Sequence, residues 1–169
     1  IDRMRSRKFT GISFSKLLGT GTGATFTPSD ADLTRWGMVV VIEKSRFEAF
    51  DSSSIVSNWR KRSTSEFRAI LSPLSSHGLW AKENPFDFTA PLSNPEAQIA
   101  AITRARIKWN KNLIFWKSVP PVVIDLHNNP GLVVAIGIGE APIGLQGTFS
   151  LWQSATALRD FAYKGKAHQ

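Results

Sequence analysis

Residues 131–168 read GLVVAIGIGEAPIGLQGTFSLWQSATALRDFAYKGKAH, and the expected fold is derived from this stretch outward. Residues 131–140 form an apolar run that ends in the turn-forming sequence Gly-Ile-Gly-Glu-Ala-Pro, and residues 147–153 form a second, alternating run. From residue 154 to residue 168 the apolar positions take up helical spacing. The stretch therefore predicts two strands joined as a hairpin, followed by a helix with His168 close to its end.

An earlier part of the chain repeats this order. The glycines and the spacing of residues 11–19 align with those of residues 131–139, Gly37 aligns with Gly147, and Phe50 aligns with Phe161. Self-similarity of this kind indicates a repeated supersecondary unit, which here is a strand, a strand and a helix. The first copy has the longer loop, because more residues separate its two strands.

The remaining sequence supplies the other elements expected of an α+β protein. Strands are expected at residues 12–18, 37–43, 66–74 and 97–109, where apolar residues alternate or run together. Helices are expected at residues 45–62, with a break near 51–54, and at residues 112–127, with a kink at Pro120-Pro121. Residues 75–95 are rich in Pro, Asn and Ser, and such a long loop is usually functional or links two parts of a fold.

These elements predict two ferredoxin-like βαββαβ halves, each of which lacks one piece. The first half covers residues 1–76 and lacks its opening strand, residues 77–96 form the connecting loop, and the second half covers residues 97–169 and lacks its closing strand. We therefore expect the sequence to be incomplete at both ends. Two such halves can pair into an α+β barrel with helices on one sheet face and the barrel interior on the other. The alternative to an incomplete sequence is an exchange of elements between subunits.

Composition narrows the classes of function. The 169 residues include no cysteine, which excludes a disulfide scaffold, a thiolate metal site and a cysteine nucleophile. The formal net charge is +8, and basic residues cluster at 3–8 and 60–62. Neither cluster is interleaved with aromatic residues in a nucleic-acid motif, so we expect no nucleic-acid partner. The charge then indicates a solvated basic face, with contact to an anionic membrane surface as the alternative.

The candidate site of chemistry is His168. Leu158, Phe161, Gly165 and His168 fall on one face of the expected helix, and the first two indicate that this face is buried. The glycine leaves room for a flat group. A neutral imidazole in such a place is a competent iron ligand, and a haem needs only one protein ligand. The flanking lysines favour the alternative, an exposed histidine at the end of a helix.

Other motifs have plainer interpretations. His77 and His127 are expected to be surface or capping residues. No carboxylate or second histidine stands at metal-ligand spacing from His168, which disfavours a zinc site or a non-haem iron site. The glycine-rich residues 19–23 lack the lysine and the helix of a phosphate-binding loop, and we expect them to lie in a hairpin loop.

Arg104, Glu140 and Gln146 are candidate catalytic groups. Arg104 and Arg106 share one side of a largely apolar strand, and a buried arginine there needs an anionic partner such as Glu140, a haem propionate or a substrate. The alternative is a strand side that faces solvent. The polar side chains within residues 146–150 alternate on one strand face, which either lines a cavity or faces water.

At these residues the sequence resembles a known family, the spheroidene monooxygenases. The resemblance is carried by Thr103–Ile107, Phe115–Trp116 with Val119–Pro121, Gly137–Pro142, Gln146–Trp152 and Phe161–Tyr163 with His168, and in the first half by Phe14–Gly21 and Phe26–Pro28. It covers nearly the whole chain. It implies a haem-containing oxygenase that converts a carotenoid to a ketone with dioxygen and electrons from a donor protein. It also implies a dimeric α+β barrel, and hence a homodimer, with His168 as the axial ligand of the iron.

The expected function is therefore a haem-dependent monooxygenase acting on an apolar, carotenoid-like substrate. The residues expected to hold the haem are His168, Arg104, Phe149 and Phe161, and those expected near the reacting oxygen are Arg104, Glu140 and Gln146. The expected location is the cytoplasm, with peripheral contact to the inner face of the membrane as a further expectation. Two alternatives stay open: another haem-dependent reaction such as a dehydration, and a barrel that binds haem or a ligand without turnover.

Overall fold

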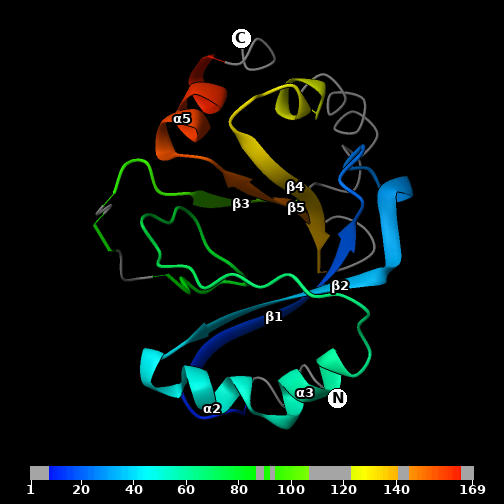
Figure 1. Ribbon diagram of the computed structural model, residues 1–169, viewed down its shortest axis with the longest axis vertical. Helices are drawn as coiled ribbons and strands as arrows, with labels where there is room; N and C mark the ends of the chain where they lie inside the picture. Colours follow the sequence, from blue (N-terminus) through cyan, green and yellow to red (C-terminus); the bar gives the residue numbers. More distant parts are fainter. Residues whose placement is uncertain (1–7, 87–89, 92–93, 107–122, 141–144, 165–169) are drawn as a thin grey trace. The chain divides into compact units, whose positions relative to one another are not determined.

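The structure is a computed structural model that describes residues 8–86, 90–91, 94–106, 123–140 and 145–164 (Figure 1). The fold is α+β. Its strands are β1 (Ile12–Gly21), β2 (Ala31–Ile42), β3 (Ile99–Arg106), β4 (Leu132–Gly139) and β5 (Leu145–Trp152). Its α-helices are α2 (Phe47–Asp51), α3 (Ser54–Arg60) and α5 (Ala155–Lys164), and two short 3-10 helices are η1 (Pro28–Asp30) and η2 (Lys44–Arg46). Residues 123–127 are also helical.

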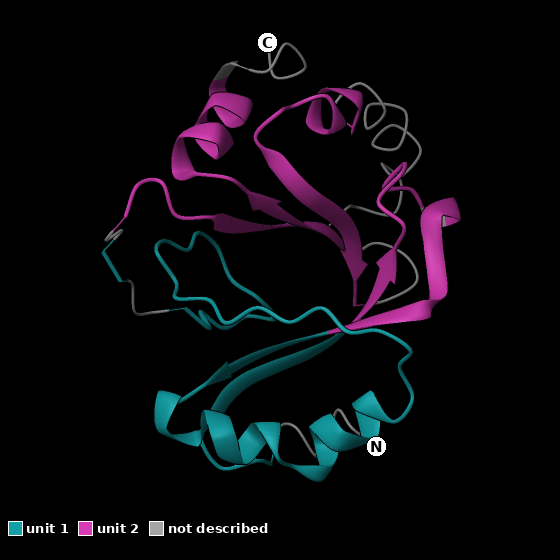
Figure 2. Cartoon of the chain, in the orientation of Figure 1, with its two compact units in different colours: residues 1–17, 38–92 teal, residues 18–37, 93–169 magenta. Residues whose placement is uncertain are grey.

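The five strands form one sheet in the order β2-β1-β4-β5-β3. The pairs β1–β4, β4–β5 and β3–β5 are antiparallel. The chain divides into two compact units, residues 1–17 with 38–92 and residues 18–37 with 93–169 (Figure 2). Strands β1 and β2 contribute residues to both units. The predicted α+β class, the predicted strands at 12–18 and 37–43, and the predicted hairpin and helix after residue 131 are confirmed.

The second unit is built around Trp152, whose side chain is 1% exposed. It forms a buried cluster with Leu126 and Ala135, and Phe26, Ile99, Leu132, Ala157, Leu158 and Phe161 pack around that cluster. The predicted apolar face of the last helix therefore packs on the core at Leu158 and Phe161, which are partly buried. Helix α5 begins where the hydroxyl oxygen of Ser154 accepts a hydrogen bond from the backbone N–H of Ala157 at 3.2 Å, a standard N-cap.

In the first unit, helices α2 and α3 follow β2. Phe50 and Ile55 are the buried residues of these helices, and the ring of Phe50 lies 5.4 Å from the ring of Phe9. The predicted break in this helical segment is confirmed, because α2 ends at Asp51 and the hydroxyl of Ser53 caps the start of α3. Serine favours this position, since its side chain accepts a hydrogen bond from a backbone N–H of the first turn that has no helical partner.

The strand predicted at residues 66–74 is wrong. Residues 64–79 form neither helix nor strand, and Phe67 and Ile70 are 68% and 74% exposed. Alternation of apolar residues produces a strand only where another strand offers backbone partners. Here the first part of the segment contacts the helices through side chains, because Glu66 pairs with Arg60 and Arg68 pairs with Asp51. The predicted kink at residues 120–121 lies outside the described residues.

The loop predicted at residues 19–35 is shorter than expected, because β1 continues to Gly21 and β2 begins at Ala31. Residues 22–30 connect them around the carboxylate of Asp30. This carboxylate accepts hydrogen bonds from the backbone N–H groups of Gly23 at 3.0 Å, Thr25 at 3.3 Å and Phe26 at 3.2 Å, and from the hydroxyl of Thr22. The carboxylate thus occupies amide groups of this loop. Of the glycine-rich residues 19–23, which were predicted to lie in a hairpin loop, residues 19–21 instead belong to β1.

Candidate functional site

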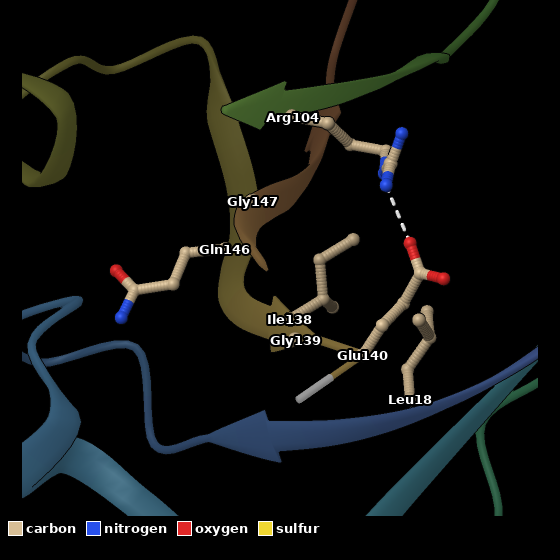
Figure 3. A pocket seen from close by; sticks show the side chains of 7 residues that line it. All are labelled: Leu18, Arg104, Ile138, Gly139, Glu140, Gln146 and Gly147. Atoms are coloured by element: carbon tan, nitrogen blue, oxygen red, sulfur yellow. Dashed lines mark hydrogen bonds and ion pairs between the residues drawn. The ribbon is translucent and has the colours of Figure 1, made fainter. Parts of the chain in front are cut away.

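Arg104 and Glu140 form an ion pair that crosses β5, the strand that lies between β3 and β4. Arg104 lies on β3 opposite Gly147 of β5, and Gly147 lies opposite Ile138 of β4. The guanidinium passes over Gly147 to reach the carboxylate of Glu140, which follows the end of β4 (Figure 3). The side chains of Arg104 and Glu140 are 24% and 14% exposed. Of the anionic partners considered for Arg104, the structure therefore contains Glu140.

Gly147 makes this crossing geometrically possible. A Cβ atom at this position would overlap the backbone carbonyl oxygen of Thr103 and lie 3.3 Å from Cγ of Arg104. The absence of a side chain lets β3 and β5 approach closely and leaves a path for the arginine, as is typical of glycine inside a strand. The glycine in β5 therefore leaves the space that the side chain of Arg104 uses.

A small recess lies beside the ion pair. Its lining residues are Leu18, Arg104, Ile138, Gly139, Glu140, Gln146 and Gly147 (Figure 3). It measures about 10 Å³, close to the least that holds one water molecule. The recess is polar at the ion pair and apolar at Leu18 and Ile138. In this form it accommodates a small polar molecule but not a macrocycle or a polyene.

Gln146 borders the recess, but its side chain points away from the ion pair (Figure 3). Successive residues of a strand face opposite sides of the sheet, and Gln146 precedes Gly147, over which the arginine passes. Ser150 shares the strand face of Gln146, where it is 7% exposed and accepts a hydrogen bond from the indole N–H of Trp152 at 2.9 Å. The face of β5 that carries Gln146 is therefore part of the buried core at Ser150. The structure brings together two of the three candidate catalytic residues.

The two aromatic candidates lie on opposite faces of the sheet. Phe149 stands opposite Ile102 of β3 and Ile136 of β4, on the same strand face as Gly147 and the ion pair. Phe161 lies on α5, packs against the core cluster, and has its ring 5.1 Å from a Trp152 ring. The two phenylalanines therefore do not face one another across a common cavity in the described part of the chain.

His168 and Gly165 lie outside the described residues, so the axial-ligand assignment stays a prediction. The other two histidines have no contact with the recess. His77 is exposed in the segment without regular structure. His127 donates from Nε2 to the carbonyl oxygen of Gly23 at 2.7 Å, and its ring stacks on Phe26 with centroids 6.0 Å apart. Within the described ranges, no group of three or more His, Cys, Asp or Glu residues is arranged to hold a metal ion.

The described residues alone do not fit a haem. The recess beside Arg104 is too small for the macrocycle, and the guanidinium already binds Glu140 instead of being presented to a propionate. No imidazole of the described ranges borders the recess. A haem site would therefore depend on His168 and on a wider opening than the one seen here.

Asp30 is the polar residue that the sequence interpretation missed. It is 9% exposed. Burial raises the pKa of its carboxyl, but hydrogen bonds from Thr22 and from the backbone N–H groups of Thr25, Phe26 and Gly23 outweigh burial and leave this pKa below its ordinary value. The loop it organises holds Phe26 in the left-handed region, at a φ of 53°. The signal in the sequence is the aspartate that ends Thr-Pro-Ser-Asp, a residue type that binds backbone amides in turns.

Among the helices formed by described residues, none combines the length and the apolar character needed to cross a bilayer. No family model matches the chain, and no solved structure matches it. Three curated proteins do match, each named spheroidene monooxygenase. The protein from Cereibacter sphaeroides is 35% identical over 152 residues, which are 88% of this chain and 46% of that protein. The protein from Rhodobacter capsulatus is 32% identical over 93% of this chain and 66% of its own length.

The third relative, from Rubrivivax gelatinosus, is 34% identical over 164 residues, which are 94% of this chain and 61% of that protein. The chain thus spans about half to two thirds of the length of the curated relatives it matches. Identity at this level, over nearly all of the chain, supports the resemblance drawn from the motifs. The chain belongs to the spheroidene monooxygenase family.

Proposed function

We propose that this chain is part of a carotenoid monooxygenase. The observation that carries the proposal is its 32–35% identity to three proteins named spheroidene monooxygenase, over 88–94% of the chain. A monooxygenase places one oxygen atom of dioxygen in the substrate and reduces the other to water with two electrons and two protons. Conversion of a methylene to a ketone takes two such rounds, with loss of water from the intermediate geminal diol. The electrons come from a donor protein.

We also propose the duplicated ferredoxin-like architecture. In the second unit the chain order is β3, the helix at 123–127, β4, β5 and α5, and the sheet order is β4-β5-β3. This order is that of a βαββαβ half in which the first strand pairs with the third, and it supports the proposal. In the other half, β1, β2 and the helices α2 and α3 follow in the same order as β4, β5 and α5. Homodimerisation is part of this proposal, and light scattering tests it.

The cofactor proposed is haem, with His168 as its axial ligand. When bound, haem iron supplies the dioxygen chemistry that no side chain can supply. This proposal rests on the family resemblance and on the partly buried helix face that Leu158 and Phe161 form. It requires the recess beside Arg104 to widen or the haem to lie elsewhere.

Absorption spectra of the purified chain with added haem test the ligand. We expect a Soret band that shifts on reduction, that His168→Ala removes or alters, and that the control His77→Ala leaves unchanged. An equal band in His168→Ala would remove this residue from the ligand set. The absence of any specific band in the parent would refute the haem proposal.

Product analysis tests the reaction. Carotenoid supplied with an electron donor under ¹⁸O₂ is expected to give a ketone that carries the label. Arg104 and Glu140 are the proposed polar groups near the reacting carbon, and Arg104→Ala and Glu140→Gln are expected to lower kcat. A product formed without dioxygen would indicate a dehydratase instead, and bound haem with no product would indicate a binding protein.

A further inference from the structure

The start of β2 carries two large apolar side chains that project from the second unit. Leu33 is 86% exposed and Trp36 is 60% exposed. Both lie in residues 32–36, here called the Leu33–Trp36 tip, on a strand at the edge of the sheet. Figure 1 shows this part of β2 as a light-blue ribbon. Exposed side chains of this size close together in sequence commonly mark an interaction surface.

The polar groups of the tip bond to one another. The indole N–H of Trp36 donates to the carbonyl oxygen of Leu33 at 3.1 Å, so the indole lies beside residue 33. Asp32 accepts from the backbone N–H of Thr34 at 2.9 Å and from its hydroxyl at 2.6 Å. The second oxygen of the same carboxylate pairs with Nε of Arg35 at 3.1 Å. The indole N–H of Trp36 and the carboxylate of Asp32 therefore already have partners within the tip, which lowers the cost of moving these two groups out of water.

We propose that the Leu33–Trp36 tip inserts into the interfacial layer of an anionic phospholipid bilayer. Indole favours this layer because it combines an apolar ring with a polar edge, and leucine adds apolar area just below it. The net charge of +8 supplies long-range attraction to anionic lipid. The choice of a membrane rests in part on the proposed function, because a carotenoid substrate is apolar and dissolves in lipid.

The size of the tip favours lipid over a protein partner. A specific protein interface buries about 800 Å² on each partner. Five consecutive residues with two large apolar side chains provide much less than this. A peripheral anchor, in contrast, needs only a few inserted side chains together with electrostatic attraction. The tip therefore fits a bilayer surface better than it fits another folded chain.

Vesicle flotation of the purified chain tests the inference. One set of vesicles contains phosphatidylglycerol and phosphatidylcholine, and a second contains phosphatidylcholine alone. The double variant Leu33→Ser with Trp36→Ser is expected to bind the first set about tenfold more weakly than the parent or worse. The matched control is Leu79→Ser, which changes a leucine that is 67% exposed outside the tip and is expected to bind as the parent does. Circular dichroism verifies that each variant folds.

Tryptophan fluorescence gives a second readout. The parent is expected to show a blue shift on the anionic vesicles that Trp36→Phe removes. Failure of the parent to bind, or equal weakening by Leu79→Ser, would overturn the proposal. So would a tip variant that keeps vesicle binding but loses self-association by light scattering, because the tip would then be a protein contact.

Turnover separates this inference from the proposed function. Carotenoid is supplied either dispersed in detergent or embedded in the vesicles. The tip variant is expected to keep the rate of the parent in detergent and to lose turnover from vesicles. If the parent formed no product from carotenoid in detergent or in vesicles, the proposed function would be contradicted. Vesicle flotation would then test the membrane inference without reference to turnover. Equal turnover of parent and tip variant from vesicles would contradict the membrane inference alone.

Discussion

Replacement of Asp30 by alanine is expected to destabilise the second unit. The substitution removes the acceptor of three backbone N–H groups and one hydroxyl in residues 22–30. A hydrogen bond to a charged group contributes about 1.5–3 kcal/mol where the donor is buried. Only the N–H of Gly23 belongs to a buried hydrogen bond, and the other donors regain part of that energy from water. The expected loss is therefore about 3 kcal/mol, well short of the sum.

Loss of the Asp30 carboxylate is also expected to affect contacts between the loop and the core of the second unit. Gly23 adopts a φ of 86° and lies against the backbone of Ala135 in β4. Phe26, held in the left-handed region, packs on the core cluster and on His127. An aromatic residue in that region is strained by about 1 kcal/mol, and the strain persists only while the surrounding bonds hold it. Without the carboxylate, the loop is expected to release both contacts.

Chemical unfolding in urea measures the effect, and hydrogen exchange at Gly23, Thr25 and Phe26 localises it. Asp30→Asn is the matched control, because its amide keeps one oxygen acceptor and loses only the charge. We expect Asp30→Asn to cost less than Asp30→Ala, and exchange to accelerate most at these three amides. A loss below about 0.5 kcal/mol for Asp30→Ala, with protection intact, would refute the assignment of Asp30 as the organiser of the loop.

The pH dependence follows from the lowered pKa of Asp30. Burial acts to raise this pKa, but the hydrogen bonds dominate, so the folded protein binds a proton on Asp30 less readily than the unfolded chain does. The stabilisation is therefore fully present above the unfolded-state pKa and is lost as pH falls through the lower folded-state pKa. The difference in stability between the parent and Asp30→Asn is expected to be constant near neutral pH and to shrink in acid.

Three further outcomes are expected. Gly147→Ala should destabilise the β3–β5 pairing strongly, because the new Cβ atom would overlap the carbonyl oxygen of Thr103. Gly19→Ala should be tolerated, because the nearest atom to its new Cβ would be 3.9 Å away. Thermal unfolding of the two variants compares their stabilities. Trp152→Ala should cost about 3–5 kcal/mol in urea unfolding, because it empties the centre of the core. Asp51→Asn should speed tryptic cleavage after residues 61–62, since Asp51 pairs with Arg60 and Arg68; unchanged cleavage would show that these pairs do not hold the segment.

Elements whose partners are close in sequence could be predicted from sequence alone. The hairpin after residue 131 has its turn signal and both strands within one stretch, and the break before α3 is marked by the capping Ser53. The prediction of a strand at 66–74 was wrong because alternating apolar residues do not indicate whether a neighbouring strand is available for backbone hydrogen bonds. That segment is fixed by Glu66 and Arg68, whose ion pairs with α2 and α3 join residues six to seventeen positions apart.

The candidate site was predictable in part. The position of Arg104 in a largely apolar strand predicted that it would bind an anionic group such as Glu140, and the two residues form an ion pair. Gln146 was placed with them although strand alternation sets it on the other face from Gly147. The role of Asp30 as an acceptor of backbone hydrogen bonds could not be predicted from residue spacing. It depends on how the backbone N–H groups of residues 23–26 converge in the folded loop.

The ion pair across β5 has a consequence for the folding pathway. Arg104 and Glu140 are 36 residues apart and meet only when β3, β5 and β4 are all in register. Such a contact closes late, after the strands have paired, so it should be absent from the folding transition state. Loss of the pair should then leave the folding rate almost unchanged and speed unfolding. The arginine therefore lowers the unfolding rate of the folded sheet and leaves its folding rate almost unchanged.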